Sequence, residues 1–322
     1  MRMSQESFPS LGPHGFHRVA YTDWGDPANP HVVLCVHGLS RNSRDFDFLA
    51  DSLSRDCRVV CMDVAGRGDS DWLEEKSDYS FTTYLSDAAA LVARITKPAP
   101  RAFGGRWRRR TDATRLDWVG TSMGGLIGML LAAKRGSPIR RLVLNDVGPF
   151  VPWNALFRLK GGIGRRHAFA SREEARAWLR EACAGFGPLS GAQWEHLFAH
   201  GLSRLEDGSW ALRYDPAIGG GGALPARADP ELPLGPDFLR GIDLWSTWNG
   251  VECPVLALRG AQSEVLTPKT LEEMRRRKPG LEAVEFEGVG HAPALFDALQ
   301  IEAVRGFLLR ADLEPQKGRA TA

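Results

Sequence analysis

The amino-acid sequence predicts an α/β protein with a doubly wound, mainly parallel sheet. Strand-like apolar runs alternate with stretches of helical spacing through most of the chain. One of these runs, residues 32–36, is apolar without interruption, which is typical of a strand buried on both faces. Three glycine-containing loops, at residues 37–40, 120–125 and 288–293, each follow a strand-like run.

The chain before the central loop predicts four strands and two helices. The first strand is expected at an edge of the sheet and ends in the turn Gly25-Asp26-Pro27. The later strands are apolar runs, and the helices between them have helical spacing. The expected strands are residues 16–21, 32–36, 58–62 and 116–119, and the expected helices are residues 43–54 and 82–95.

The remaining elements continue the alternation after the central loop. A helix is expected over residues 126–134, and strands are expected over residues 139–144, 255–258 and 283–286. Residues 149–243, between the expected strands at 139–144 and 255–258, interrupt this alternation.

The central loop has the pattern Gly-x-Ser-x-Gly, with Ser122 between Gly120 and Gly124. A strand-like run precedes it and a helix-like run follows, which is the context of a nucleophile elbow. The turn holds its serine in a strained backbone conformation, so only small flanking residues fit. Ser122 is therefore the candidate nucleophile.

Two histidine loops lie on either side of the elbow in the sequence. His37-Gly38-Leu39-Ser40 follows an early strand, and His291 lies between Gly290 and Ala292 after a late strand. A serine hydroxyl needs a general base, and His291 is the candidate. The order serine, acid, histidine resembles the alpha/beta-hydrolase superfamily over about residues 15–310, and residues 63–70 resemble its Asp-x-x-Gly-x-Gly-x-Ser loop.

The resemblance leaves two candidates for the acid that orients His291. In that family, an aspartate often stands four residues before a proline in the loop after the strand at 255–258. This chain has Glu264 at that position, before Pro268. The alternative is Asp146, which follows the strand at 139–144. The expected assignment is Glu264, with Asp146 as the alternative.

The resemblance also implies an oxyanion hole formed by the backbone N–H groups of Leu39 and Met123. Met123 is expected at a helix N-terminus, where the helix dipole favours negative charge. The residue before Gly38, here His37, usually supports this loop in the family and does not act as the base.

Two segments interrupt the alternation of strands and helices. Residues 149–243 contain helical stretches near 171–184 and 190–200, and the resemblance implies a cap over the cleft. The expected organisation is a core of residues 1–148 and 244–322 with a cap of residues 149–243, in which the glycine run and the Pro-rich stretch to Pro236 are expected to be mobile. The basic residues 97–115 join a helix to a strand, so a solvated insertion away from the catalytic loops is favoured over a phosphate or membrane-surface site.

Composition excludes several other classes of protein. The net charge of +2 gives no support for nucleic-acid binding, and no run reaches the length of a membrane span. No metal-ligand spacing or dinucleotide fingerprint is present, so neither a metal nor a cofactor is expected. The five cysteines lack a Cys-x-x-Cys spacing and the N-terminus lacks a signal peptide, which together indicate reduced thiols in a cytoplasmic protein.

A serine at the elbow excludes the aspartate-dependent dehalogenase and epoxide-hydrolase mechanisms of the superfamily. The expected reaction is hydrolysis of a small, apolar ester or lactone through an acyl-enzyme intermediate. One alternative is hydrolysis of a carbon–carbon bond in a vinylogous diketone, because such family members share the Gly-x-Ser-x-Gly-Gly elbow present here. The other is a ligand receptor that retains the triad without turnover.

Overall fold

The main sheet of the protein has eight strands in the order β1-β2-β4-β3-β5-β6-β12-β13. The computed structural model describes residues 3–96, 114–162, 168–219 and 241–311. Neighbouring strands run parallel from β4 to β13, whereas β1 and β2 are antiparallel to their neighbours. This confirms the mainly parallel sheet. Its strands are β1 (Met3–Gly12), β2 (Gly15–Trp24), β3 (His31–Val36), β4 (Arg58–Met62), β5 (Arg115–Thr121), β6 (Ile139–Asn145), β12 (Val255–Gly260) and β13 (Glu282–Phe286).

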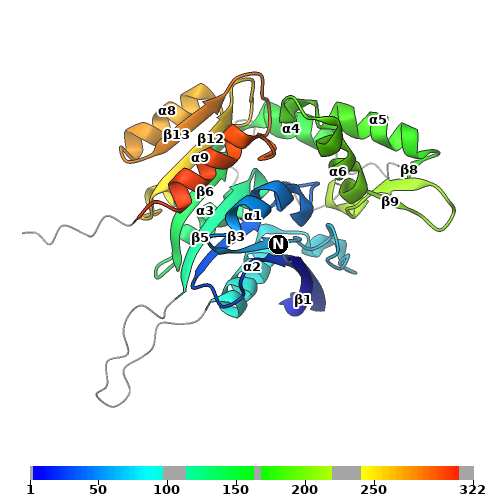
Figure 1. The fold of residues 1–322 in the computed structure, drawn as a ribbon, viewed down its shortest axis with the longest axis horizontal. Coiled ribbons are helices and arrows are strands. Elements are labelled where there is room, and N and C mark those ends of the chain that lie inside the picture. Colours follow the sequence, from blue (N-terminus) through cyan, green and yellow to red (C-terminus); the bar gives the residue numbers. More distant parts are fainter. Residues whose placement is uncertain (1–2, 97–113, 163–167, 220–240, 312–322) are drawn as a thin grey trace, which may run out of the picture.

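Helices cover both faces of this sheet (Figure 1). The apolar side chains of α1 and α9 pack in one buried cluster, and those of α2, α3, α7 and α8 pack in another. These two clusters form the core on either side of the strands, as a doubly wound fold requires. The helices are α1 (Asp47–Leu53), α2 (Phe81–Ile95), α3 (Met123–Ala132), α7 (Trp245–Asn249), α8 (Pro268–Arg277) and α9 (Ala298–Leu308), with short 3₁₀ turns η1 (Ser43–Phe46) and η2 (Lys76–Asp78).

The expected edge strand at residues 16–21 is not at the edge. It forms part of β2, which pairs with β4 on one side and with β1 on the other. β1 is the edge strand, and its sequence was not recognised because it is mostly polar and half-exposed. A strand with so few buried apolar residues gives little hydrophobic pattern in the sequence.

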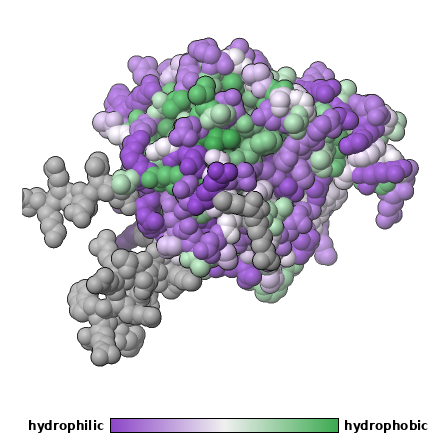
Figure 2. Space-filling view, in the orientation of Figure 1, coloured by the Kyte–Doolittle hydropathy of each residue, from purple (hydrophilic) through white to green (hydrophobic). Residues whose placement is uncertain are grey.

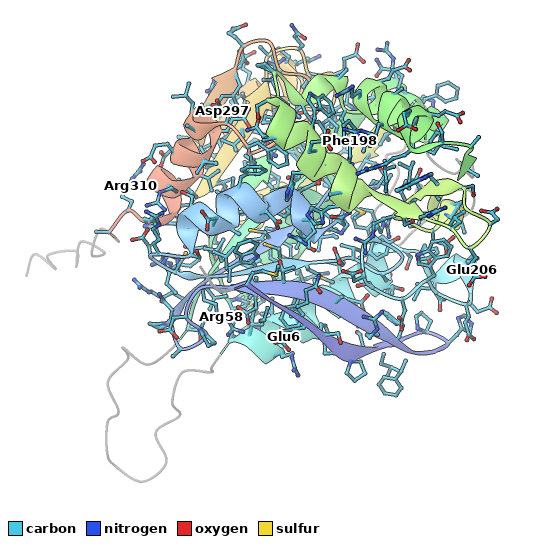
Figure 3. The ribbon with its side chains drawn as sticks, turned by 45° about the vertical axis from the view of Figure 1, so that its right-hand side comes forward. Glu6, Arg58, Phe198, Glu206, Asp297 and Arg310 are labelled. Carbon is cyan, nitrogen blue, oxygen red and sulfur yellow. The ribbon has the colours of Figure 1, made fainter. Side chains whose placement is uncertain are left out.

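The described residues between 150 and 243 form a separate group of small elements beside the main sheet, on the right in Figure 1. Their first and last strands pair with each other, which brings the two ends of the group together. A buried cluster of its own includes Phe198, labelled on its helix in Figure 3, together with Leu179 and Phe169. The elements are β7 (Phe150–Pro152), α4 (Trp153–Gly162), β8 (Ala168–Phe169), α5 (Arg172–Ala182), η4 (Ala184–Phe186), α6 (Gly191–Gly201), β9 (Leu202–Arg204), β10 (Trp210–Leu212), η5 (Pro216–Gly219) and β11 (Gly241–Asp243).

One part of this group packs into the core of the main domain. The carboxylate of Asp215 accepts hydrogen bonds from the Tyr79 hydroxyl (2.7 Å) and from Lys76 Nζ (2.6 Å). Tyr214 and Ile218 belong to the same buried cluster as α2 and α3. The residues that follow β10 therefore stabilise the core as well as the inserted elements.

Two sequence expectations concern segments outside the described residues. The basic insertion lies there except for its last two residues, and so do the glycine run and the Pro-rich stretch to Pro236, except for Gly219. None of the described helices is long and apolar enough to cross a membrane. The face shown in Figure 2 is mostly hydrophilic, with hydrophobic residues gathered over its upper part. All five cysteines are free thiols, and four of them are buried.

Candidate active site

Ser122 lies at a sharp turn between β5 and α3. Its backbone has φ 52° and ψ −114°, the strained left-handed conformation expected of a nucleophile elbow. A Cβ on Gly120 would lie 2.3 Å from the Gly124 carbonyl oxygen, and one on Gly124 would lie 2.0 Å from the Val36 carbonyl oxygen. The two flanking glycines are therefore required by close backbone packing.

His291 contacts Ser122 through one ring nitrogen. Its Nε2 lies 2.9 Å from Ser122 Oγ, so the hydroxyl can donate to the imidazole. The side-chain amide of Asn145 fixes the loop beyond the histidine by donating to the Pro293 carbonyl oxygen (2.8 Å). The backbone N–H of Gly290 donates to the carbonyl oxygen of Gly185 on η4 (2.7 Å). The histidine loop is thus held by β6 and by the inserted elements.

Asp146 is the carboxylate that contacts His291. Its Oδ2 lies 2.6 Å from His291 Nδ1, which must carry a proton to donate to it. The same carboxylate accepts hydrogen bonds from Gly260 N–H (3.0 Å) and from the Ser263 hydroxyl (2.5 Å). The side chain of Asp146 is fully buried, and its φ of 57° directs it off the end of β6. Three donors compensate for its loss of hydration.

Glu264, the expected acid, does not lie against His291; of the two candidates, the alternative, Asp146, is the one that contacts it. Glu264 forms an ion pair with Arg158 on α4, and both side chains are more than half exposed. The neighbouring residue, Ser263, turns inward to Asp146 instead. The loop after β12 therefore supports the acid site through its serine, while its glutamate faces the inserted elements.

The expected oxyanion donors border the same space as Ser122. A Cβ on Gly38 would lie 3.7 Å from Ser122 Cβ, so the loop that carries Leu39 passes next to the nucleophile. Met123 is the first residue of α3, where a backbone N–H has no partner within the helix. Leu39 and Met123 therefore lie next to Ser122, on two different segments of the core.

Two buried side chains, those of His37 and Arg67, form hydrogen bonds to the loop that carries Leu39. His37 Nδ1 donates to the Gly38 carbonyl oxygen (2.7 Å), and its Nε2 accepts from Val64 N–H (3.0 Å). Burial lowers the pKa of His37 to about 3, so it is neutral and engaged at both nitrogens. This supports the expectation that His37 braces the loop and is not the base.

Arg67 is fully buried behind the oxyanion loop. Its Nε donates to the Leu39 carbonyl oxygen (2.8 Å), and its guanidinium also contacts Met123 Sδ (3.8 Å). The guanidinium lies 4.9 Å from the ring centre of Tyr84, a cation–π contact. Arg67, Asn145 and Ser263 were not singled out from the sequence. Asn145 is the last residue of β6, and Arg67 and Ser263 lie in the loops after β4 and β12, so position at or after a strand end is the signal that could have indicated them.

A cavity of about 330 Å³ opens over Ser122 and His291. Core loops form one side of it, and the inserted elements α4, α5, η4 and β10 form the other. Most of its wall is apolar, with polar groups limited to a few positions, as in many small-molecule sites. The wall on the side of the inserted elements consists of Arg158, Trp178, Leu179, Ala182, Cys183, Phe186, Leu212 and Tyr214.

One group of side chains outside this cavity has the donor types of a metal site. Ligand atoms of Asp47, His196 and His200 lie within 4.8 Å of one another. Protein groups already engage two of them, because Arg44 forms an ion pair with Asp47 and the Arg44 carbonyl oxygen accepts from His196 Nε2 (2.8 Å). These contacts join α6 to η1 and α1.

The chain is similar to a known protein family and to named proteins over most of its length. The model of the "Alpha/beta hydrolase family" matches residues 33–303. A 3-hydroxybutyrate-oligomer hydrolase from Cupriavidus necator is 41% identical and covers 94% of this chain and 96% of its own. An esterase from Mycobacterium tuberculosis is 28% identical, with 88% and 84% covered.

Solved structures show the same fold. A putative hydrolase from Rickettsia typhi matches with a TM-score of 0.81 at 26% identity, covering 97% of this chain and 100% of its own. An alpha/beta hydrolase from Novosphingobium aromaticivorans matches with a TM-score of 0.77 at 32% identity, covering 96% and 99%.

Proposed function

Because this chain belongs to the alpha/beta hydrolase family, we propose that it hydrolyses carboxylic esters through a triad of Ser122, His291 and Asp146. One observation carries the proposal, the continuous contact from Ser122 Oγ to His291 Nε2 (2.9 Å) and from His291 Nδ1 to Asp146 Oδ2 (2.6 Å). Relatives that cover most of the chain carry the names of ester hydrolases.

The proposed reaction has two halves. His291 Nε2 removes the proton of Ser122 as its Oγ attacks the ester carbonyl carbon, and Asp146 stabilises the imidazolium through Nδ1–H. The backbone N–H groups of Leu39 and Met123 bind the tetrahedral oxyanion. His291 then protonates the leaving alcohol. In the second half, it activates a water that releases the acid and restores Ser122.

The substrate we propose is a small ester made of short hydroxy acids, of the class of 3-hydroxybutyrate oligomers. The cavity volume of about 330 Å³ is at the lower end of the range for ligand sites and suits a short chain. The 41% identity to a hydrolase named for that oligomer, over nearly the full length of both chains, supports the same class.

A turnover screen tests this function directly. The panel contains p-nitrophenyl acetate, butyrate and laurate, the 3-hydroxybutyrate dimer and trimer, a lactone and a vinylogous diketone. We expect the short esters and the oligomers to be hydrolysed faster than the laurate. Turnover of the diketone alone would indicate carbon–carbon bond hydrolysis. A stoichiometric burst of acylation without further turnover would indicate a receptor.

We further propose that residues 149–243 act as a cap that sets substrate length. Trp178 on α5 lines the cavity opposite the core loops. Trp178→Ala removes an indole from that wall, so we expect the ratio of laurate to butyrate hydrolysis to rise. Trp210→Ala is the matched control, because Trp210 lies in the same segment but not in the cavity wall. An equal shift in both variants would contradict the cap.

A further inference from the structure

Two guanidinium groups, those of Arg41 and Arg158, line the mostly apolar cavity above Ser122. Arg41 is bound firmly: its Nε and a terminal nitrogen both donate to Asp45 (2.7 Å each), and the Arg41 side chain is only 13% exposed. Its charge also lies 5.7 Å from the ring centre of Phe186. A bidentate, largely buried ion pair of this kind is not readily exchanged for a ligand.

Arg158 is held much less firmly. Its ion-pair partner Glu264 is 52% exposed, and Arg158 itself is 64% exposed. Exposed ion pairs of this type contribute little to stability, because water solvates both partners well when they separate. A second carboxylate can therefore replace Glu264 at low cost, since Glu264 regains its hydration as it leaves.

We propose that Arg158 binds the free carboxylate of the substrate, and that Glu264 occupies the guanidinium while the site is empty. The ligand class is a short oligoester that ends in a carboxylate. The inference rests on the proposed function for the identity of this site. It adds that the enzyme acts at chain ends that carry a charge, and that it prefers a free acid to the neutral ester of the same chain.

Three features support a carboxylate over a neutral group at this position. A guanidinium matches a carboxylate with two parallel hydrogen bonds. The cavity that Arg158 borders is otherwise mostly apolar, so few other groups there offer a partner to a substrate carboxylate. Arg158 lies on α4 and Glu264 on the core loop after β12, so the exchange takes place where the inserted elements meet the core.

The test measures binding without requiring turnover. The 3-hydroxybutyrate trimer and its methyl ester are titrated calorimetrically into the Ser122→Ala protein, with and without Arg158→Gln. We expect Arg158→Gln to weaken binding of the free acid about tenfold more than binding of the methyl ester, as loss of one charge-assisted contact implies. Glu264→Gln should strengthen binding of the free acid, because the internal competitor loses its charge.

Arg204→Gln is the matched control, since Arg204 is an exposed arginine of the same segment outside the cavity wall. An equal loss for the free acid and the methyl ester would overturn the carboxylate role. Failure of both trimer forms to bind would overturn it as well. If both forms bind as expected but wild-type protein hydrolyses neither, the carboxylate site stands and the proposed ester hydrolysis fails.

Discussion

Ser122→Ala is expected to lower the turnover of p-nitrophenyl butyrate by on the order of 10⁶, as loss of a triad serine does in other serine hydrolases. The rate enhancement that remains in this variant comes from the backbone oxyanion donors and from substrate binding alone. The fold should be unaffected, because alanine fits wherever serine does and the elbow is held by Gly120 and Gly124. Steady-state kinetics measure the loss, and circular dichroism checks the fold.

Ser40→Ala is the matched control for this variant, because Ser40 lines the same cavity without contacting His291. A fluorophosphonate probe should label the wild-type protein and the Ser40 variant, but not Ser122→Ala. Labelling of Ser40 in its place, or turnover by Ser122→Ala near the wild-type level, would remove Ser122 from the role of nucleophile.

Asp146→Asn should cause the second-largest loss, toward the ~10⁴ known for the corresponding change in a serine protease. An amide preserves the size of the side chain, but it removes the charge that stabilises the imidazolium. It can also donate to His291 Nδ1 and so favour the wrong tautomer. The measurement is kcat for p-nitrophenyl butyrate across neutral pH.

Glu264→Gln provides the internal comparison for Asp146→Asn. Glu264 is paired with Arg158 at the surface, so its charge should affect the turnover of a neutral ester far less than the charge of Asp146 does. The reverse order of severity would return the acid to Glu264. It would also mean that the loop after β12 rearranges when substrate binds.

The elbow and the histidine were predictable because their chemistry constrains backbone as well as side chain. A serine at a positive φ needs small neighbours, and Gly120 and Gly124 are therefore visible in the sequence. The strand before the elbow, β5, is buried from Leu116 to Gly120 and mostly apolar, whereas β13 before the His291 loop is only half-buried. Local sequence is sufficient in such cases.

The carboxylate that contacts His291 was not predictable in the same way, because β6 and β12 are parallel neighbours in the sheet. The loops that follow them meet at one edge, and a carboxylate from either could reach the histidine. The choice depends on the direction of the side chain, which is set by the φ of Asp146 and by the donors Gly260 and Ser263. Ser263 and Glu264 are adjacent, yet they face opposite environments.

The hydrogen bond from Gly290 to Gly185 limits how the enzyme can be redesigned. It ties the loop that presents His291 to the η4 turn, and a Cβ on Gly185 would lie only 3.1 Å from the His291 carbonyl oxygen. The inserted segment is therefore not an interchangeable module. A graft that reshapes the pocket but displaces this junction alters proton transfer together with selectivity, so swaps from relatives must preserve the backbone path through residues 185–187.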